Sequence, residues 1–309
     1  MRDDLTPYLE RIQRALGRDL TYTACERLGG LTNRNYRLDC ASGSFVLRIA
    51  GEGTADFINR AHEEVNAALA SRAGVNVDIF FFDAADGTML SRFLPDSQTM
   101  SAEAFRDSGS LGRAGRVLRR LHDSGSEFAN RFELFEQIDR YLAVLDEKGA
   151  DLPPGYASVQ ERAERIRRAL GRHSLPYRPC HCDPLVENFL DDGTTMHLID
   201  FEYSGNNDPM WDLGDLAVEG GFQAEQEEHL LAGYFGAEPA PFDRARMVMY
   251  KALCDLLWTL WGVVQHVNGN PAEDFWAYAL GRLERCSRLL ARADFEEHLV
   301  LLERISGPA

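Results

Sequence analysis

The sequence contains very little lysine, and acidic residues outnumber basic ones. Only Lys148 and Lys251 are lysines among its 33 basic residues, and 49 acidic residues give a formal net charge of −16. Proteins that bind nucleic acids non-specifically, or that are attracted to anionic membranes, need a basic surface. The composition therefore predicts a protein that binds neither. Elsewhere in the chain, any cationic role must fall to arginine.

Long uninterrupted apolar runs, a signal-peptide pattern and regular cysteine spacing are also absent. The most apolar window, Val248–Val267, carries charged or polar residues at positions 251, 255, 265 and 266. It predicts a buried helix, because a membrane span needs about 20 nearly uncharged residues. The N-terminal segment lacks a basic start followed by an apolar stretch, and six irregularly spaced cysteines do not indicate a disulfide framework. We expect a soluble, cytoplasmic protein.

The order of apolar patterns along the chain predicts two lobes. After one N-terminal helix, short apolar runs separated by Gly, Asn and Asp predict a five-stranded antiparallel sheet that contains one helix, Phe57–Arg72. Beyond residue 95, helical periodicity dominates except in the segment 179–201. We expect an α+β, two-lobed fold of the protein-kinase type. Its smaller N-terminal lobe covers residues 1–94, and its mainly helical C-terminal lobe covers residues 95–309.

The non-helical segment carries the strongest chemical signal. The letters HCDPLVEN occupy positions 181–188, and twelve residues after Asn188 an apolar strand ends in Asp200. Phosphoryl transfer from ATP requires a carboxylate beside the acceptor hydroxyl and oxygen ligands for Mg²⁺. Asp183 fits the first role, and Asn188 and Asp200 fit the second, with the spacing of the protein-kinase catalytic loop. A loop with solvated carboxylates is the alternative, but the preceding sheet favours the kinase interpretation.

The adjacent residues Cys180, His181 and Cys182 raise the alternative of a metal site. Zinc sites usually space their cysteines by two to four residues, and no second Cys/His pair is placed to complete one. We therefore expect His181 to be a core histidine that supports the backbone of the loop.

A nucleotide-binding element is expected in the N-terminal lobe. In the segment LGGLTNRNY, Gly29 and Gly30 let the backbone approach phosphates, and Thr32 and Asn33 add side-chain donors. An ordinary hairpin turn would explain the same letters. Arg48, on the third predicted strand, is the candidate cation for the α- and β-phosphates.

An acidic residue is needed to hold this arginine in place. The predicted helix offers Glu63, which shares a face with Ala67 and Ala70, and Glu64 is the alternative. The adenine site is expected at the junction of the lobes, near Phe93 and Leu94.

Together these segments resemble the choline/ethanolamine kinase family, within the aminoglycoside-phosphotransferase-like group. The resemblance covers most of the chain, and it includes GGLTN at 29–33, IDFEYS at 199–204, WDLGD at 211–215 and LWTLWGVVQ at 257–265. It implies that ATP and Mg²⁺ are the cofactors, that Asp183 is the catalytic base, and that Asn188 and Asp200 bind the metal. An arginine on the third strand is usual in choline kinases.

The resemblance also implies a pocket for a small cationic alcohol. In choline kinases a Trp-x-x-Trp helix, the Tyr after Asp-Phe-Glu and a downstream Glu line the choline site. The matching residues here are Trp258, Trp261, Tyr203 and Glu219. Aromatic walls bind quaternary ammonium groups by cation–π attraction. Without the resemblance, two tryptophans in an apolar helix would be interpreted as core.

Choline is the first expectation for the acceptor, but alternatives remain. Glu202 and Asp212 are expected as structural support, Asp212 for the catalytic loop. The segment after Glu219 is poor in aromatics, and Leu185 stands where many choline kinases carry Gln. Ethanolamine, thiamine or an aminoglycoside are therefore alternative acceptors. A catalytically inactive binding protein is the rival, and the oligomeric state is left open, with a homodimer among the possibilities.

Overall fold

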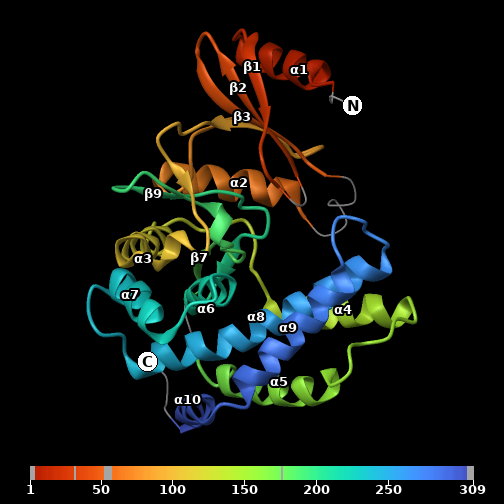
Figure 1. The fold of residues 1–309 in the computed structure, drawn as a ribbon, viewed down its shortest axis with the longest axis vertical. Coiled ribbons are helices and arrows are strands. Elements are labelled where there is room, and N and C mark those ends of the chain that lie inside the picture. Colours follow the sequence, from red (N-terminus) through yellow and green to blue (C-terminus); the bar gives the residue numbers. More distant parts are fainter. Residues whose placement is uncertain (1–3, 31–32, 52–57, 175–176, 305–309) are drawn as a thin grey trace.

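A five-stranded antiparallel sheet forms the core of the upper lobe in Figure 1, and helices dominate the lower one. The computed structural model describes residues 4–30, 33–51, 58–174 and 177–304. Helix α1 (Thr6–Leu16) precedes the sheet, and α2 (Arg60–Arg72) lies between β3 and β4 in the chain. The strand order is β1-β2-β3-β5-β4, with strands Tyr22–Arg27 (β1), Arg34–Cys40 (β2), Gly43–Ile49 (β3), Ile79–Asp83 (β4) and Thr88–Arg92 (β5). The expected five strands with one inserted helix are confirmed.

Alternation of side chains sets the two faces of this sheet. Leu38 of β2 and Leu47 of β3 are fully buried, in one apolar cluster with Ile12 of α1. Because strand side chains alternate, Arg48 points to the opposite face. Helix α2 begins after Asn59, whose side chain accepts hydrogen bonds from the first-turn N–H groups and caps the helix. The expected helix start at residue 57 lies outside the described residues.

The second lobe is mainly helical, as expected, and contains two small sheets, β6-β8-β9 and β7-β10. Its helices are Ser108–His122 (α3), Leu134–Glu147 (α4), Tyr156–Leu170 (α5), Met210–Glu219 (α6), Ala224–Phe235 (α7), Pro241–Val267 (α8), Phe275–Leu290 (α9) and Ala293–Arg304 (α10). Its strands are Gln98–Thr99 (β6), Arg178–Cys180 (β7), Phe189–Asp191 (β8), Met196–Leu198 (β9) and Gly205–Asn207 (β10). Strand β6 pairs with β8. The lobe boundary predicted at residues 94 and 95 lies between β5 and β6 in the chain and stays a prediction.

The helix expected over residues 102–121 begins later in the structure. Ala104–Arg106 form a short 3₁₀ turn, and α3 starts only at Ser108. The cause is Asp107, whose carboxylate accepts a hydrogen bond of 2.7 Å from the Ser110 N–H and caps the new helix. Apolar periodicity does not detect such a cap, and the prediction for these first residues was wrong.

Helix α8 is the core helix of the lower lobe. It is long and apolar enough to cross a membrane, yet 83% of its most apolar window is buried inside the protein. It packs along α9, as Figure 1 shows, and against α6. Its burial agrees with the polar interruptions in its sequence.

Helices α3 and α7 cross at glycines. A Cβ atom on Gly115 would lie 2.4 Å from the carbonyl oxygen of Leu230, and one on Gly233 would lie 2.5 Å from that of Gly112. Backbone therefore packs directly against backbone, which any larger side chain would prevent.

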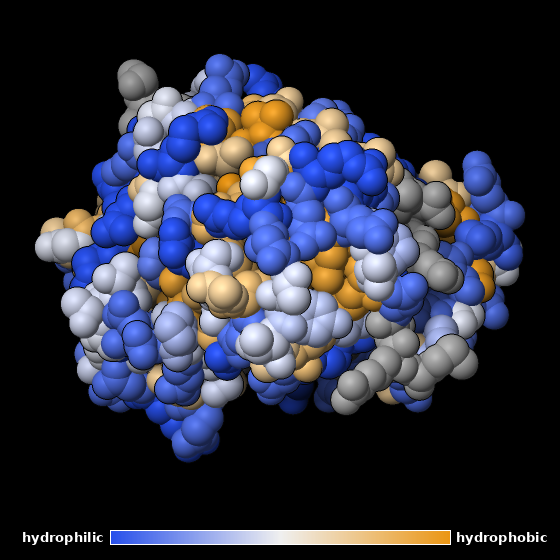
Figure 2. Space-filling view, turned by 90° about the horizontal axis from the view of Figure 1, so that it is seen from above, coloured by the Kyte–Doolittle hydropathy of each residue, from blue (hydrophilic) through white to orange (hydrophobic). Residues whose placement is uncertain are grey.

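The surface seen from above is mostly hydrophilic, with apolar residues in small separate patches (Figure 2). All six cysteines lie within the described residues and are free thiols, four of them buried. This agrees with the expectation that they form no disulfide framework.

Candidate active site

The segment HCDPLVEN forms a tight loop between β7 and β8. Cys182, just before Asp183, has a left-handed backbone with φ of 66°, a strained conformation that is common at functional sites. The Nδ2 group of Asn188 donates to the Asp183 carbonyl at 3.1 Å. Burial, together with the nearby carboxylates of Glu219 and Asp200, raises the pKa of Asp183 well above its usual range.

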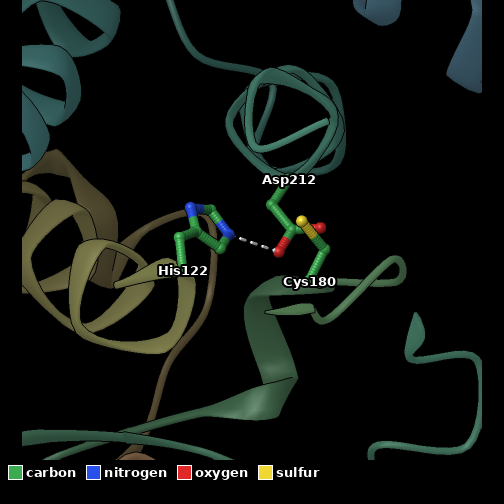
Figure 3. A group of neighbouring side chains, drawn as sticks. All are labelled: His122, Cys180 and Asp212. Carbon is green, nitrogen blue, oxygen red and sulfur yellow. Dashed lines mark hydrogen bonds and ion pairs between the residues drawn. The ribbon is translucent and has the colours of Figure 1, made fainter. Parts of the chain in front are cut away.

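Asp212 of α6 holds the backbone of this loop. Its two carboxylate oxygens accept hydrogen bonds from the His181 N–H (2.7 Å) and the Cys182 N–H (2.9 Å). His122 of α3 points at the same carboxylate in Figure 3, with its Nε2 3.0 Å away. The His181 ring lies 2.8 Å from the Ile199 carbonyl oxygen through Nε2. Asp212 therefore binds the backbone of the loop, and His181 binds the segment before Asp200. Their role as structural support stays a prediction.

Cys180 lies beside His122 and Asp212 in Figure 3, and the donor atoms of the three lie within 4.8 Å of one another. Metal binding by cysteine requires the thiolate. Burial raises the pKa of the Cys180 thiol well above its usual range, and the thiol donates to the Asn207 carbonyl oxygen. The cluster therefore fits a hydrogen-bonded support better than a zinc site.

Asn188 precedes β8, and Asp200 follows β9, the strand that pairs with β8. The Ile199 N–H donates to the Asn188 carbonyl oxygen at 2.9 Å, and Asp200 has a left-handed backbone with φ of 67°. Within the part of the chain that the structure describes, its Oδ1 is buried without a hydrogen-bond partner, and it lies 3.5 Å from Nη1 of Arg48. Burial and the Glu202 carboxylate raise the pKa of Asp200 to about 8. The Asn188 amide, which donates through Nδ2, keeps Oδ1 available, so both residues offer the oxygen ligands that Mg²⁺ prefers.

Arg48 forms a buried ion pair with Glu63 of α2, whereas Glu64 is exposed. Arg60 was missed by sequence reasoning. Its Nη1 lies 2.6 Å from Glu63 Oε2 and 3.0 Å from Glu202 Oε2. One guanidinium therefore links the upper lobe to the strand end that carries Asp200.

The glycine-containing loop reaches the same carboxylate. Asn33 Nδ2 donates to Glu202 Oε2 at 3.0 Å. Gly30 has φ of 147°, and a Cβ there would lie 2.6 Å from the Asn33 carbonyl oxygen, so only glycine fits. The Gly29 carbonyl accepts from the Asn35 side chain, and Thr32 lies outside the described residues.

Phe93 and Leu94 follow β5 and are partly buried at the junction of the lobes. The guanidinium of Arg37 stacks on the Phe93 ring, 4.3 Å from its centroid. A cationic side chain therefore covers one face of the Phe93 ring, and the adenine site near Phe93 and Leu94 stays a prediction.

A series of aromatic rings lies on the acceptor side. Tyr203 meets Trp258 edge-to-face at 5.5 Å between centroids, and Trp258 meets Trp261 at 6.0 Å. Trp261 in turn contacts Phe275 and Tyr278 of α9. Sequence reasoning missed these last two, although their spacing of three on a helix is the same signal as that of the two tryptophans.

A cavity of about 360 Å³ opens beside this wall. Tyr203 and Trp258 line one part of it, and Glu136 and Tyr141 of α4 line another. Gly205, two residues after Tyr203, pairs with Cys180, and its carbonyl oxygen accepts from the Cys182 thiol, so the loop that carries Asp183 lies near this wall.

Glu219 at the end of α6 is not a free carboxylate. It forms an ion pair with Arg282 of α9, a residue that sequence reasoning also missed. The charge of Glu219 nevertheless raises the pKa of Asp183, and after burial it makes the largest contribution to that shift.

Comparison with known proteins identifies the family. A family model described as the phosphotransferase enzyme family matches residues 23–250. The chain belongs to this family. A choline/ethanolamine kinase family protein from Mesorhizobium loti is 48% identical, with a TM-score of 0.86 over 95% of this chain and 98% of that one.

Other relatives of this phosphotransferase include proteins named LicA. Choline kinase LicA from Streptococcus pneumoniae is 28% identical, with a TM-score of 0.77 over 92% and 99% of the two chains. A structure of LicA in complex with AMP is similarly close, at 28% identity and a TM-score of 0.76 over 93% and 97%. Protein LicA of Haemophilus influenzae is 31% identical over 85% of this chain and 78% of its own length. The resemblance to choline/ethanolamine kinases and the kinase-like fold are thereby confirmed. The phosphotransferase is a kinase that acts on a small alcohol.

Proposed function

We propose that this phosphotransferase moves the γ-phosphoryl group of ATP to the hydroxyl of choline. The observation that carries the proposal is the aromatic wall of Tyr203, Trp258 and Trp261 beside the Asp183 loop. Aromatic faces attract quaternary ammonium groups, which are weakly hydrated and have no N–H groups to satisfy. A primary ammonium gains less from such a wall, because its N–H groups need hydrogen-bond acceptors.

Asp183 is the proposed base. The acceptor hydroxyl would lie against its carboxylate, which orients the hydroxyl and takes its proton as the phosphoryl group arrives. A raised pKa strengthens that carboxylate as a base in its ionised form. Positioning and charge stabilisation then supply most of the catalysis.

Arg48 and the Gly29–Asn33 loop are proposed to hold the phosphates of ATP, and the AMP complex of a relative supports a nucleotide site. Asn188 and Asp200 would hold Mg²⁺, which neutralises charge on the transferring phosphates when bound. The buried Oδ1 of Asp200, without a hydrogen-bond partner, fits a metal ligand. A cytoplasmic location is proposed with this function, since ATP is the donor.

The test is ADP release from Mg·ATP with choline, ethanolamine, thiamine and kanamycin as acceptors. We expect choline to have the highest kcat/KM, by about tenfold or more over ethanolamine, because of the aromatic wall. A higher value for ethanolamine, thiamine or kanamycin would refute choline as the acceptor. The Asp183→Asn variant is the control: it should bind ATP but lose about 100-fold or more of kcat.

A further inference from the structure

One guanidinium below the aromatic wall joins three helices. Arg282 of α9 pairs with Glu219 of α6 and lies 3.1 Å from Asp255 Oδ1 of α8. Its Nη2 donates to the Tyr278 hydroxyl at 2.8 Å. The Arg282 side chain is only 8% exposed, and among charged side chains only arginine has a planar fork that can serve three partners in fixed directions.

Each partner of Arg282 lies close to the acceptor side. The Tyr278 ring contacts Trp261 and also stacks under the guanidinium, at 5.0 Å. Asp255 precedes Trp258 by three residues, about one helical turn. Glu219 is paired with the same guanidinium that donates to the Tyr278 hydroxyl, so only one side chain separates its carboxylate from a ring that contacts Trp261.

The charge next to the aromatic rings bears on which head group an acceptor can present. In an amino alcohol, two carbons separate the hydroxyl from the nitrogen, and the Arg282–Glu219 pair adjoins the rings through Tyr278, which contacts Trp261. A free carboxylate there would favour a primary ammonium, which can donate hydrogen bonds to it. A carboxylate already neutralised by arginine offers less to such a donor and leaves the aromatic rings as the main attraction.

We propose that Arg282 is a specificity-determining positioning residue: by neutralising Glu219 and fixing Tyr278, it biases the pocket toward quaternary over primary ammonium acceptors. This inference rests on the proposed function of the site. It concerns the ratio of kcat/KM for choline to kcat/KM for ethanolamine, and how that ratio changes when the arginine is replaced.

The decisive variant is Arg282→Met, which removes the main cationic partner of Glu219 and leaves the longer contact of 3.8 Å to Arg285. We expect the choline-to-ethanolamine ratio to fall by about fivefold or more, through KM rather than kcat, with the KM for ATP unchanged. The double variant Glu219→Gln/Arg282→Met removes both charges and should return the ratio toward that of the wild type. Arg282→Lys, which keeps a charge beside Glu219, should shift the ratio less than Arg282→Met does.

The matched control is Arg285→Met on the same helix. Arg285 also binds Asp255, but its side chain is 39% exposed and its Nη2 lies 3.8 Å from Glu219. We expect this variant to change the ratio by less than about twofold. An equal shift in both methionine variants would mean that helix packing, and not neutralisation of Glu219, sets the ratio.

The outcomes separate the two proposals. Wild-type protein that phosphorylates neither amino alcohol, or that prefers ethanolamine, refutes choline as the acceptor before any variant is made. A wild-type preference for choline that survives Arg282→Met refutes the role of Arg282 and leaves the function intact. Should Arg282→Met fail to fold, the double variant and Arg282→Lys still decide. Both should keep the ratio within about twofold of the wild type, and a fall of about fivefold in the double variant, which has no Glu219 charge left to neutralise, contradicts the proposal.

Discussion

At the scale of single residues, the buried carboxylates of Asp255 and Asp215 differ in the hydrogen bonds that they accept. Asp255 accepts hydrogen bonds from both Arg282 and Arg285. Asp215 of α6 is fully buried. Among the described residues its carboxylate accepts a hydrogen bond only from the Cys254 thiol, through Oδ1, and Oδ2 has no partner there. Two aspartates in one region therefore make opposite contributions to stability.

Replacement of Asp215 by Asn should stabilise the protein at pH 8. Burial and the neighbouring Glu219 and Asp183 carboxylates raise the pKa of Asp215 well above its usual range. Above about pH 4 an unfolded chain releases this proton while the folded protein keeps it, so stability falls as pH rises. We expect a gain of about 1–3 kcal/mol at pH 8 that shrinks toward pH 4, measured by denaturant unfolding.

The opposite sign is expected for Asp255→Asn, which removes the buried carboxylate charge that both Arg282 and the partly exposed Arg285 bind. That variant should lose about 3 kcal/mol at the same pH. Destabilisation of Asp215→Asn at pH 8 would contradict this account of the orphaned carboxylate.

At this scale the sequence predicted some residues of the candidate active site and missed others. Asp183, Asn188 and Asp200 were predicted because they lie close together in the chain with a fixed spacing. Arg60 and Arg282 were missed, because their partners Glu202 and Glu219 lie 142 and 63 residues away. No periodic pattern links residues that meet only in the folded chain.

At the scale of elements, the crossing of α3 and α7 depends on glycine at the point of contact. Gly115→Ala would place a methyl group 2.4 Å from a backbone oxygen, and backbone has no room to move aside. We expect a loss of about 1–3 kcal/mol from such overpacking, measured by thermal or denaturant unfolding.

Gly112→Ala in the same helix is the matched control. Its added methyl would meet only the mobile end of Arg116, at 3.3 Å. Because alanine is the better helix former, this variant should be neutral or about 0.5–1 kcal/mol more stable. Equal losses of stability in both variants would contradict this explanation, because only Gly115→Ala brings a methyl group against the backbone of α7.

The elements themselves were predicted well where periodicity is strong. Alternating strands with short turns gave the N-terminal sheet, and amphipathic periods gave the helices. The short strands β6, β7, β8 and β10 were missed, since two or three residues carry no period and their pairing depends on distant segments. A strand ending at Asp200 was predicted, and β9 ends two residues earlier, at Leu198. The start of α3 was misplaced because one capping side chain decided it.

At the scale of the whole molecule, hydrogen bonds and ion pairs of polar and charged side chains join the two lobes near the predicted nucleotide site. Arg60 lies between Glu63 of the upper lobe and Glu202 of the lower one, and Asn33 also binds Glu202. Removal of the guanidinium would leave two buried carboxylates facing each other across the junction, which favours separation of the lobes.

Arg60→Gln should therefore weaken ATP binding. We expect the KM for ATP to rise by about tenfold, corresponding to about 1.4 kcal/mol, while the KM for the acceptor changes little. Glu64→Gln on the exposed face of the same helix is the control and should behave as the wild type. Equal increases in both KM values for Arg60→Gln would mean that the whole site had been disturbed.

The residues beside the proposed acceptor pocket lie partly on α8, which is mostly buried, and partly on α9, which is more exposed. This difference affects how the acceptor preference of such an enzyme can change. Trp258 lies on α8, which most of the lower lobe packs around, so substitutions there carry a large penalty in stability. Tyr278 and Arg282 lie on α9, where several neighbouring positions are exposed. New acceptor preferences can therefore arise through α9 while α8 stays constant, and a library of variants confined to α9 should retain more folded members than one confined to α8.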